Sequence, residues 1–114
     1  MSTKSKSYIF KAELPYEKPT EGITRQIMGY DGQIMLVKVI FEKGAIGYLH
    51  QHIHSQSTYI ISGKFEVNIN DEKKILEAGD GFYIEPNTPH GTMCIESGVL
   101  IDAFSPIRED FLTK

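Results

Sequence analysis

The chain has 114 residues and a formal net charge of −3, with 12 Lys and Arg against 15 Asp and Glu. This length fits one domain with a substantial core, and a hydrophobic content of 40% excludes a disordered chain. Only two basic residues are arginines, no basic stripe is present, and the single cysteine, Cys94, excludes an intrachain disulfide. We therefore expect no nucleic-acid partner and no thiolate zinc site.

No apolar run approaches the ~20 residues of a membrane span, and the N-terminal stretch through Phe10 contains no hydrophobic signal region. We therefore expect a cytoplasmic protein with no membrane partner. The sequence contains 15 Ile but only 6 Leu and 4 Ala. Because β-branched residues favour strands and good helix formers are scarce, an all-β fold is expected.

Residues 1–22 are expected to form an N-terminal arm, because Pro15 and Pro19 interrupt any long element. Residues 23–114 are expected to form one barrel domain. Turn residues recur there at short intervals and separate short β-rich runs, as in sandwiches and small barrels. The predicted strands cover 23–30, 33–42, 46–52, 57–62, 64–70, 73–77, 82–85, 90–95 and 99–104.

The predicted strand 33–42 is apolar on both faces. Val37 and Phe41 belong to one face and Leu36 and Ile40 to the other, which only Lys38 interrupts. Strands of this kind are covered on both faces. In so small a domain the second cover is often another subunit, so the sequence predicts a homodimer.

One short helix is predicted at the C-terminal end, from Pro106 to about Leu112. Ser105 can act as its N-cap, and Pro106 suits the first helical position. Glu109 and Asp110 would then lie near the positive end of the helix dipole.

Three of the four histidines lie within five residues, at His50, His52 and His54. Residues two apart on a strand share a face, so His50 and His52 would be about 6.6 Å apart along it and could converge on one metal ion. Gln56 could join that ion only if the chain bends at residues 53–55. The fourth histidine, His90, follows a Pro-rich turn.

The pattern Gly44-x5-His50-x-His52-x3-Gln56-x6-Gly63 resembles the first motif of the cupin superfamily, with Gln where most members have Glu. The stretch Gly79-x6-Pro86-x3-His90 is similar to the second motif, with a spacing one residue longer and Thr88 and Cys94 in place of Gly and Asn. The resemblance implies a double-stranded β-helix, the cupin jelly-roll barrel, with a metal inside.

The metal ligands that this resemblance implies are His50, His52, Gln56 and His90, with His54 as the competitor of Gln56. The implied cofactor is one divalent ion, with Zn, Ni, Mn and Fe all open. Three imidazoles and an amide leave the charge of the ion uncompensated. Such a site favours Lewis-acid work on an acidic substrate.

Asp102 is a carboxylate on an otherwise apolar predicted strand, which is costly unless it is paired, solvated or functional. If residues 96–98 form a three-residue hairpin, His90 pairs with Phe104 and Asp102 faces the same side as His90. A two-residue turn would place Asp102 on the opposite face, beside Met93. Asp102 is therefore a candidate acid/base, with a structural salt bridge to Arg108 or a lysine as the alternative.

Arg108 is expected at the mouth of the barrel, where it is either a solvated helix residue or the anchor for a substrate carboxylate. The segment from Asp102 through Phe104 to Arg108, together with Gln56, resembles the pectin-degradation cupins that ketonise unsaturated uronates. This resemblance implies that Asp102 is the acid/base, Phe104 the pocket wall and Arg108 the carboxylate anchor. The implied reaction converts a 4,5-unsaturated uronate from pectin or alginate into a linear ketonised sugar.

Two other functions remain open at this point. An iron-dependent dioxygenase could use a similar scaffold, although the Gln ligand argues mildly against redox-cycling iron. A non-catalytic module that binds a metal or a small ligand is the third reading, since fold alone does not fix function.

Overall fold

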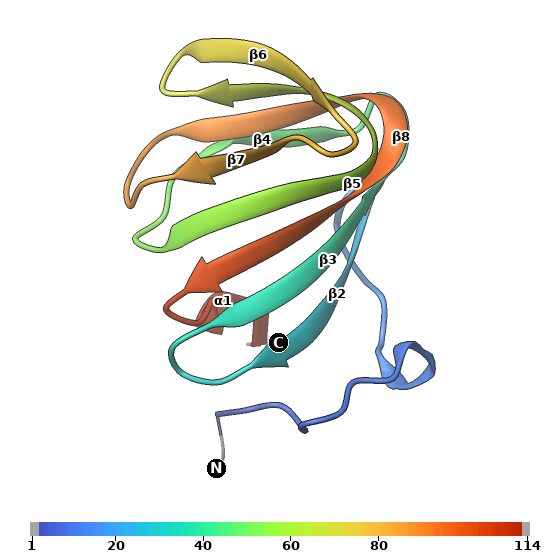
Figure 1. The fold of residues 1–114 in the computed structure, drawn as a ribbon, viewed down its shortest axis with the longest axis vertical. Coiled ribbons are helices and arrows are strands. Elements are labelled where there is room, and N and C mark those ends of the chain that lie inside the picture. Colours follow the sequence, from blue (N-terminus) through green and yellow to red (C-terminus); the bar gives the residue numbers. More distant parts are fainter. Residues whose placement is uncertain (1–2, 113–114) are drawn as a thin grey trace.

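The computed structural model describes residues 3–112 and consists mainly of β-strands (Figure 1). The all-β prediction and the short C-terminal helix are confirmed. None of the helices within the described range is long and apolar enough to cross a membrane. The elements are the 3-10 helix η1 (Lys11–Glu13), β1 (Glu17–Thr20), β2 (Ile23–Tyr30), β3 (Met35–Phe41), β4 (Ile46–His50), β5 (Ser55–Ile69), β6 (Glu72–Glu77), β7 (Gly81–Ile84), β8 (His90–Ser105) and α1 (Glu109–Leu112).

All strand pairs are antiparallel, and the main path of the sheet is β1-β2-β3-β8-β5-β6. In addition, β4 pairs with one end of β8 and β7 with one end of β5. The two long strands β5 and β8 pair along their length and bend together at one side of the molecule (Figure 1). This bend folds the sheet over on itself and encloses the core.

The predicted hairpin at residues 96–98 is wrong. Strand β8 runs without interruption from His90 to Ser105, and its partner is β5, so that Thr58 lies opposite Asp102 and Gln56 opposite Phe104. The predicted strands 57–62 and 64–70 likewise form the single strand β5. A Cβ atom on Gly63 would lie only 2.6 Å from the Cα of Gly98. The two glycines thus permit the close approach at the bend.

The C-terminal helix begins at Glu109, not at Pro106 as predicted. The side chain of Ile107 is buried at 5% exposure, and its backbone N–H donates to the carbonyl of Gly32 over 3.3 Å. Because this anchoring fixes the chain before residue 108, the helix starts one turn later. Strand β4 is also shorter than predicted and ends at His50.

The core lies inside the folded sheet and contains two groups of buried side chains. Val37, 0% exposed, and Phe104 belong to the group beneath α1, and Phe65 and Cys94 belong to the other. Burying each large apolar side chain contributes about 1.5–3 kcal/mol. Cys94 therefore acts as a small buried hydrophobe.

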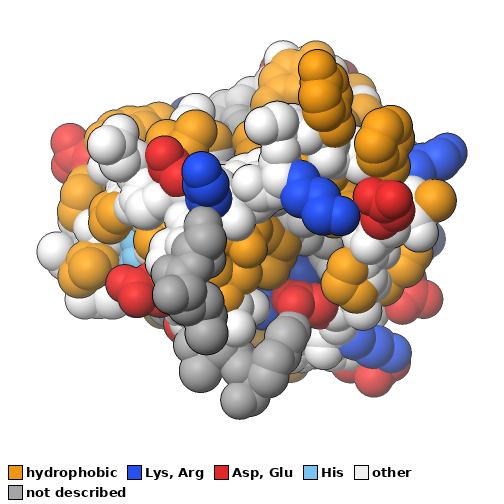
Figure 2. Space-filling view, turned by 90° about the horizontal axis from the view of Figure 1, so that it is seen from below, with side chains coloured by type: hydrophobic (Ala, Val, Ile, Leu, Met, Phe, Trp, Pro, Cys, Tyr) orange, Lys and Arg blue, Asp and Glu red, His pale blue; other side chains and the backbone are white. Residues whose placement is uncertain are grey.

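The N-terminal arm runs along the outside of β2. The backbone N–H of Ser5 donates to the carbonyl of Tyr30, and the Gln26 side chain donates to the carbonyl of Leu14. In the view from below, hydrophobic side chains lie between acidic and basic ones (Figure 2). The division into an arm over residues 1–22 and a barrel over residues 23–114 stays a prediction; β1 of the arm adds a strand at the sheet edge.

Candidate functional site

A pocket of about 260 Å³ opens between the two halves of the folded sheet. Its walls come from every strand except β6 and from the segment that contains α1. Six of the seven residues singled out in the sequence line it, namely His50, Gln56, His90, Asp102, Phe104 and Arg108. The seventh, His52, contacts Gln56 at its edge.

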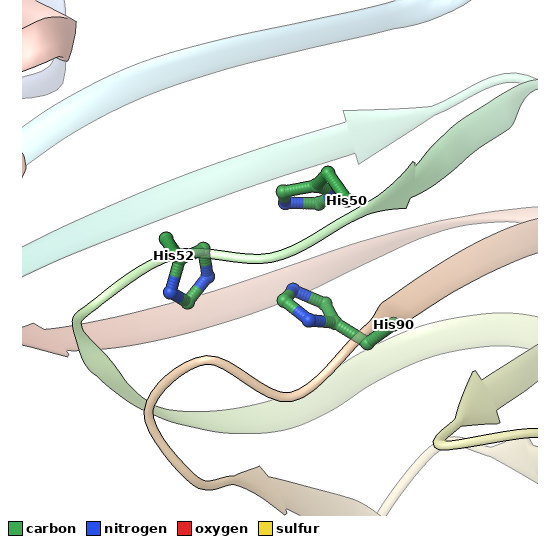
Figure 3. A group of neighbouring side chains, drawn as sticks. All are labelled: His50, His52 and His90. Carbon is green, nitrogen blue, oxygen red and sulfur yellow. The ribbon is translucent and has the colours of Figure 1, made fainter.

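Three histidines from two distant parts of the chain meet at this pocket (Figure 3). His50 ends β4, His52 lies in the bend that follows, and His90 begins β8. One ring nitrogen of each lies within 4.8 Å of the others. This spacing allows the three imidazoles to bind one metal ion.

The hydrogen bonds of these imidazoles determine which nitrogen is free. In His50 and His90, Nδ1 lies 2.8 Å from the carbonyl oxygens of Tyr48 and Thr88 respectively. In His52, Nδ1 lies 3.1 Å from the carbonyl oxygen of His54. Because a carbonyl only accepts, each Nδ1 carries the proton and each Nε2 keeps its lone pair. Backbone contacts of this kind orient histidine ligands in metal sites.

Gln56 brings a fourth donor atom to the group. Its Oε1 lies 3.1 Å from Nε2 of His52, while its Nε2 donates to Thr58 and Asp102. These two donated bonds fix the orientation of the amide, so a carbonyl oxygen faces the lone pair of an imidazole. A metal ion beside these two atoms would satisfy both lone pairs. The donor set therefore fits a metal ion.

Burial keeps the imidazoles of His52 and His90 in the form that binds metal. It lowers the pKa of His90 to about 4, an effect that the bond to Thr88 partly opposes. Burial, followed by the charge of Arg108, also lowers the pKa of His52. Both rings are therefore neutral near pH 7. Nε2 of His90 is buried and has no hydrogen-bond partner among the described residues, as expected for a ligand atom.

Asp102 lies beside this group on the inner face of β8. Its Oδ1 accepts hydrogen bonds from Thr58 Oγ1 over 2.5 Å and from Gln56 Nε2 over 3.2 Å. Burial raises the pKa of Asp102 to about 6, although the bonds from Thr58 and Gln56 and the charge of Arg108 act in the opposite direction. A carboxyl group with this pKa can exchange a proton near neutral pH.

His54 is outside the group of three. Its Nε2 lies 3.1 Å from the carbonyl oxygen of Ile107, and its ring packs edge-on against Phe104. The chain bends between His52 and Gln56, as the sequence argument required, and the bend turns His54 toward the segment before α1. Gln56 therefore contacts one of the three grouped histidines through its Oε1, whereas His54 is not among them.

Phe104 and Arg108 form the wall of the pocket next to His52. The Phe104 ring is 5.8 Å from the His52 ring, and the Arg108 guanidinium lies 5.0 Å from the centre of Phe104. Arg108 does not pair with Asp102. Instead, its Nε and Nη2 donate to the two carboxylate oxygens of Asp110, at 3.0 and 2.8 Å.

Comparison with known proteins identifies the family. The family model described as a cupin domain matches residues 37–101. The chain belongs to the cupins. The jelly-roll prediction is thereby confirmed, because the folded antiparallel sheet is also the architecture of its solved relatives. An RmlC-like cupin from Shewanella frigidimarina superimposes with a TM-score of 0.92 and 43% identity, covering 96% of this chain and 98% of that chain.

Two further relatives of this cupin are both described as KdgF. The pectin degradation protein KdgF of Dickeya dadantii is 47% identical over 92% of this chain and 97% of its own length. The structure of KdgF from Halomonas sp. has a TM-score of 0.88 and 37% identity, covering 94% of this chain and 99% of that chain. The resemblance to pectin-degradation cupins is thus confirmed along nearly the whole cupin chain.

Sequence reasoning missed Thr58, which contacts Asp102, and two residues that line the pocket. Thr58 follows Gln56 by two positions, so the alternation of a strand would have placed both on one face. Arg25 and Phe111 line the pocket, from β2 and α1. No local pattern marks them, because only the folded sheet brings these distant segments together.

Proposed function

We propose that this cupin is an enzyme of pectin breakdown that converts 4,5-unsaturated uronates into linear ketonised sugars. The observation that carries the proposal is the 47% identity to the pectin degradation protein KdgF over 92% of the chain. The pocket supports it independently, because a candidate metal site, a carboxyl group with a raised pKa and a guanidinium line the same cavity.

His50, His52, Gln56 and His90 would hold one divalent metal ion, and Zn, Ni, Mn and Fe remain open. All four donors are uncharged, so the bound ion would act as a Lewis acid that polarises substrate oxygens. The lone pairs of the imidazoles, fixed by their bonds to backbone carbonyls, support this ligand set.

Arg108 would bind the substrate carboxylate, and Phe104 would form the wall against which the sugar ring packs. A planar guanidinium matches a carboxylate with two parallel hydrogen bonds. The contact between the Arg108 guanidinium and the Phe104 ring supports a shared role. Together they would orient the sugar with its reacting carbons toward Asp102.

Asp102 would move the proton. Ring opening breaks the bond between the anomeric carbon and the ring oxygen, and releases an aldehyde and an enol. Tautomerisation then transfers a proton to the former alkene carbon and leaves a ketone, so the net reaction is an isomerisation. A carboxyl group with a pKa of about 6 can take up a proton in one step and return it in the other.

A homodimer in the cytoplasm belongs to the same proposal. Cross-strand neighbours Leu36 and Ala103 share the outer face of the sheet with Ile101 and Tyr59. Leu36 is 39% and Tyr59 55% exposed in the single chain. An apolar face that spans β3, β8 and β5 is what a second copy of the chain would cover.

The function is tested by adding a 4,5-unsaturated uronate to purified protein of known metal content and following the absorbance of the conjugated double bond. Loss of absorbance faster than in buffer supports the proposal. Consumption of oxygen with iron(II) would instead favour the dioxygenase. Metal binding without turnover would favour a binding module.

A further inference from the structure

Both arginines of the chain contact one aromatic ring at the pocket. The guanidinium of Arg25 lies 3.8 Å from the centre of the Phe111 ring, and that of Arg108 lies 4.2 Å from it. All three side chains line the pocket. They come from β2, from α1 and from the segment before it, so the contact is a meeting point of distant parts of the chain.

The contacts of Arg108 leave one edge of its guanidinium for a ligand. Asp110 accepts from Nε and Nη2, and the guanidinium carbon lies 5.0 Å from the centre of the Phe104 ring and 4.2 Å from that of Phe111. The Nη1 side, together with the second hydrogen of Nη2, is the edge that Asp110 does not engage. Since only 11% of the side chain is exposed, the guanidinium is held in one orientation.

Arg25 is fixed from the other side by the N-terminal arm. Its Nε donates to Glu17 Oε1 over 2.8 Å, and the two side chains are only 19% and 16% exposed. The other ion pair of the arm, between Lys18 and Glu21, is 58% and 92% exposed. A sheltered pair has a defined geometry, whereas an exposed one contributes little.

We propose that Glu17, Arg25 and Phe111 are positioning residues that hold the Arg108 guanidinium in place to receive the substrate carboxylate. Glu17 fixes Arg25, Arg25 packs on the Phe111 ring, and the ring contacts the Arg108 guanidinium. The inference rests on the proposed function and deepens it, because it makes the N-terminal arm part of carboxylate recognition.

The test measures KM and kcat for 4,5-unsaturated galacturonate in Phe111→Leu, Arg25→Lys and the double variant. Loss of the contact between the guanidiniums and the Phe111 ring should raise KM roughly three- to tenfold, with little change in kcat and no change in metal content. Because Arg25 acts through Phe111, the double variant should have the KM of Phe111→Leu alone. Phe111→Tyr keeps the ring and should restore KM. If the KM increases of the two single variants multiply in the double variant, Arg25 acts independently of Phe111 and the proposal is overturned.

The arm is tested with a matched pair of variants. Glu17→Gln should raise KM, whereas Glu21→Gln, the same change at the exposed pair, should not. Phe65→Leu removes a core ring outside the pocket, so it reports the effect of lost stability alone on KM. If the wild type turns over the uronate but KM is unchanged in Phe111→Leu and Arg25→Lys, the positioning proposal alone fails. If the wild type shows no turnover, the proposed function fails, and the positioning proposal with it.

Discussion

The amide Nε2 of Gln56 donates a hydrogen bond of 3.2 Å to Oδ1 of Asp102. The other end of the same amide faces His52, with Oε1 3.1 Å from the imidazole Nε2. Gln56 therefore connects the candidate metal ligands to the candidate acid/base. A glutamate at this position could still bind a metal, but it has no N–H to donate.

Gln56→Glu should keep the metal and lose turnover by roughly 100-fold. The new carboxylate places a second negative charge beside Asp102, which raises the pKa of Asp102 and removes one of its hydrogen bonds. Metal content by mass spectrometry and the rate of uronate conversion check this. Gln51→Glu, the same change at an exposed position, should leave both values as in the wild type, and a Gln56→Glu variant as active as the wild type would contradict the account.

Thr58→Val should move the acidic limb of the pH–rate profile to higher pH. The Thr58 hydroxyl donates to the ionised form of Asp102 and thereby lowers its pKa, so removing the donor raises that pKa further above about 6. Activity that needs the ionised carboxylate then disappears at a higher pH as the solution is acidified. Thr24→Val, on β2 and outside the pocket, is the control; an unmoved limb in Thr58→Val would exclude Asp102 as the titrating group.

His54→Ala should retain the metal, whereas His90→Ala should lose most of it. His90 belongs to the group of three histidines whose ring nitrogens lie within 4.8 Å of one another, whereas His54 does not and its Nε2 contacts the carbonyl of Ile107. Metal stoichiometry after dialysis separates the two variants. The ligand set is wrong if His54→Ala releases the ion or if His90→Ala keeps a full equivalent.

The strand content and the histidine group could be predicted from sequence, because alternation and the spacing of His50 and His52 are local patterns. The connection between residues 95 and 99 could not. Gly98 was interpreted as the end of a hairpin turn, but a glycine marks close backbone approach as readily as a turn. Only the long-range pairing with Gly63 distinguishes the two cases.

Asp102 shows how a wrong register can still lead to the right face. The predicted hairpin pairs His90 with Phe104, and hence Asp102 with Thr92, whereas the observed partner of Asp102 on β5 is Thr58. Asp102 and His90 nevertheless line the same pocket. The Arg108–Asp110 pair and the stack on Phe111 were not foreseeable, because side-chain pairing near a short helix depends on where that helix begins, and it begins at Glu109.

Tyr59→Lys should dissociate the proposed homodimer. Tyr59 is 55% exposed and lies beside Ile101 on the outer face of the sheet, so a lysine there would bury a charge in the contact between two copies. Ile75→Lys places the same charge on β6, outside that face, and should leave the dimer intact. Analytical ultracentrifugation checks both; a wild-type monomer of 12.9 kDa at micromolar concentration would contradict the prediction.

The central claim is tested most directly by comparing wild type and Asp102→Asn, at equal metal content, with 4,5-unsaturated galacturonate. The absorbance of the conjugated double bond is followed against the rate in buffer. The account predicts rapid loss with the wild type and only the buffer rate with Asp102→Asn, because the amide cannot move the proton. Equal rates for the two proteins, or a wild type no faster than buffer, would contradict it.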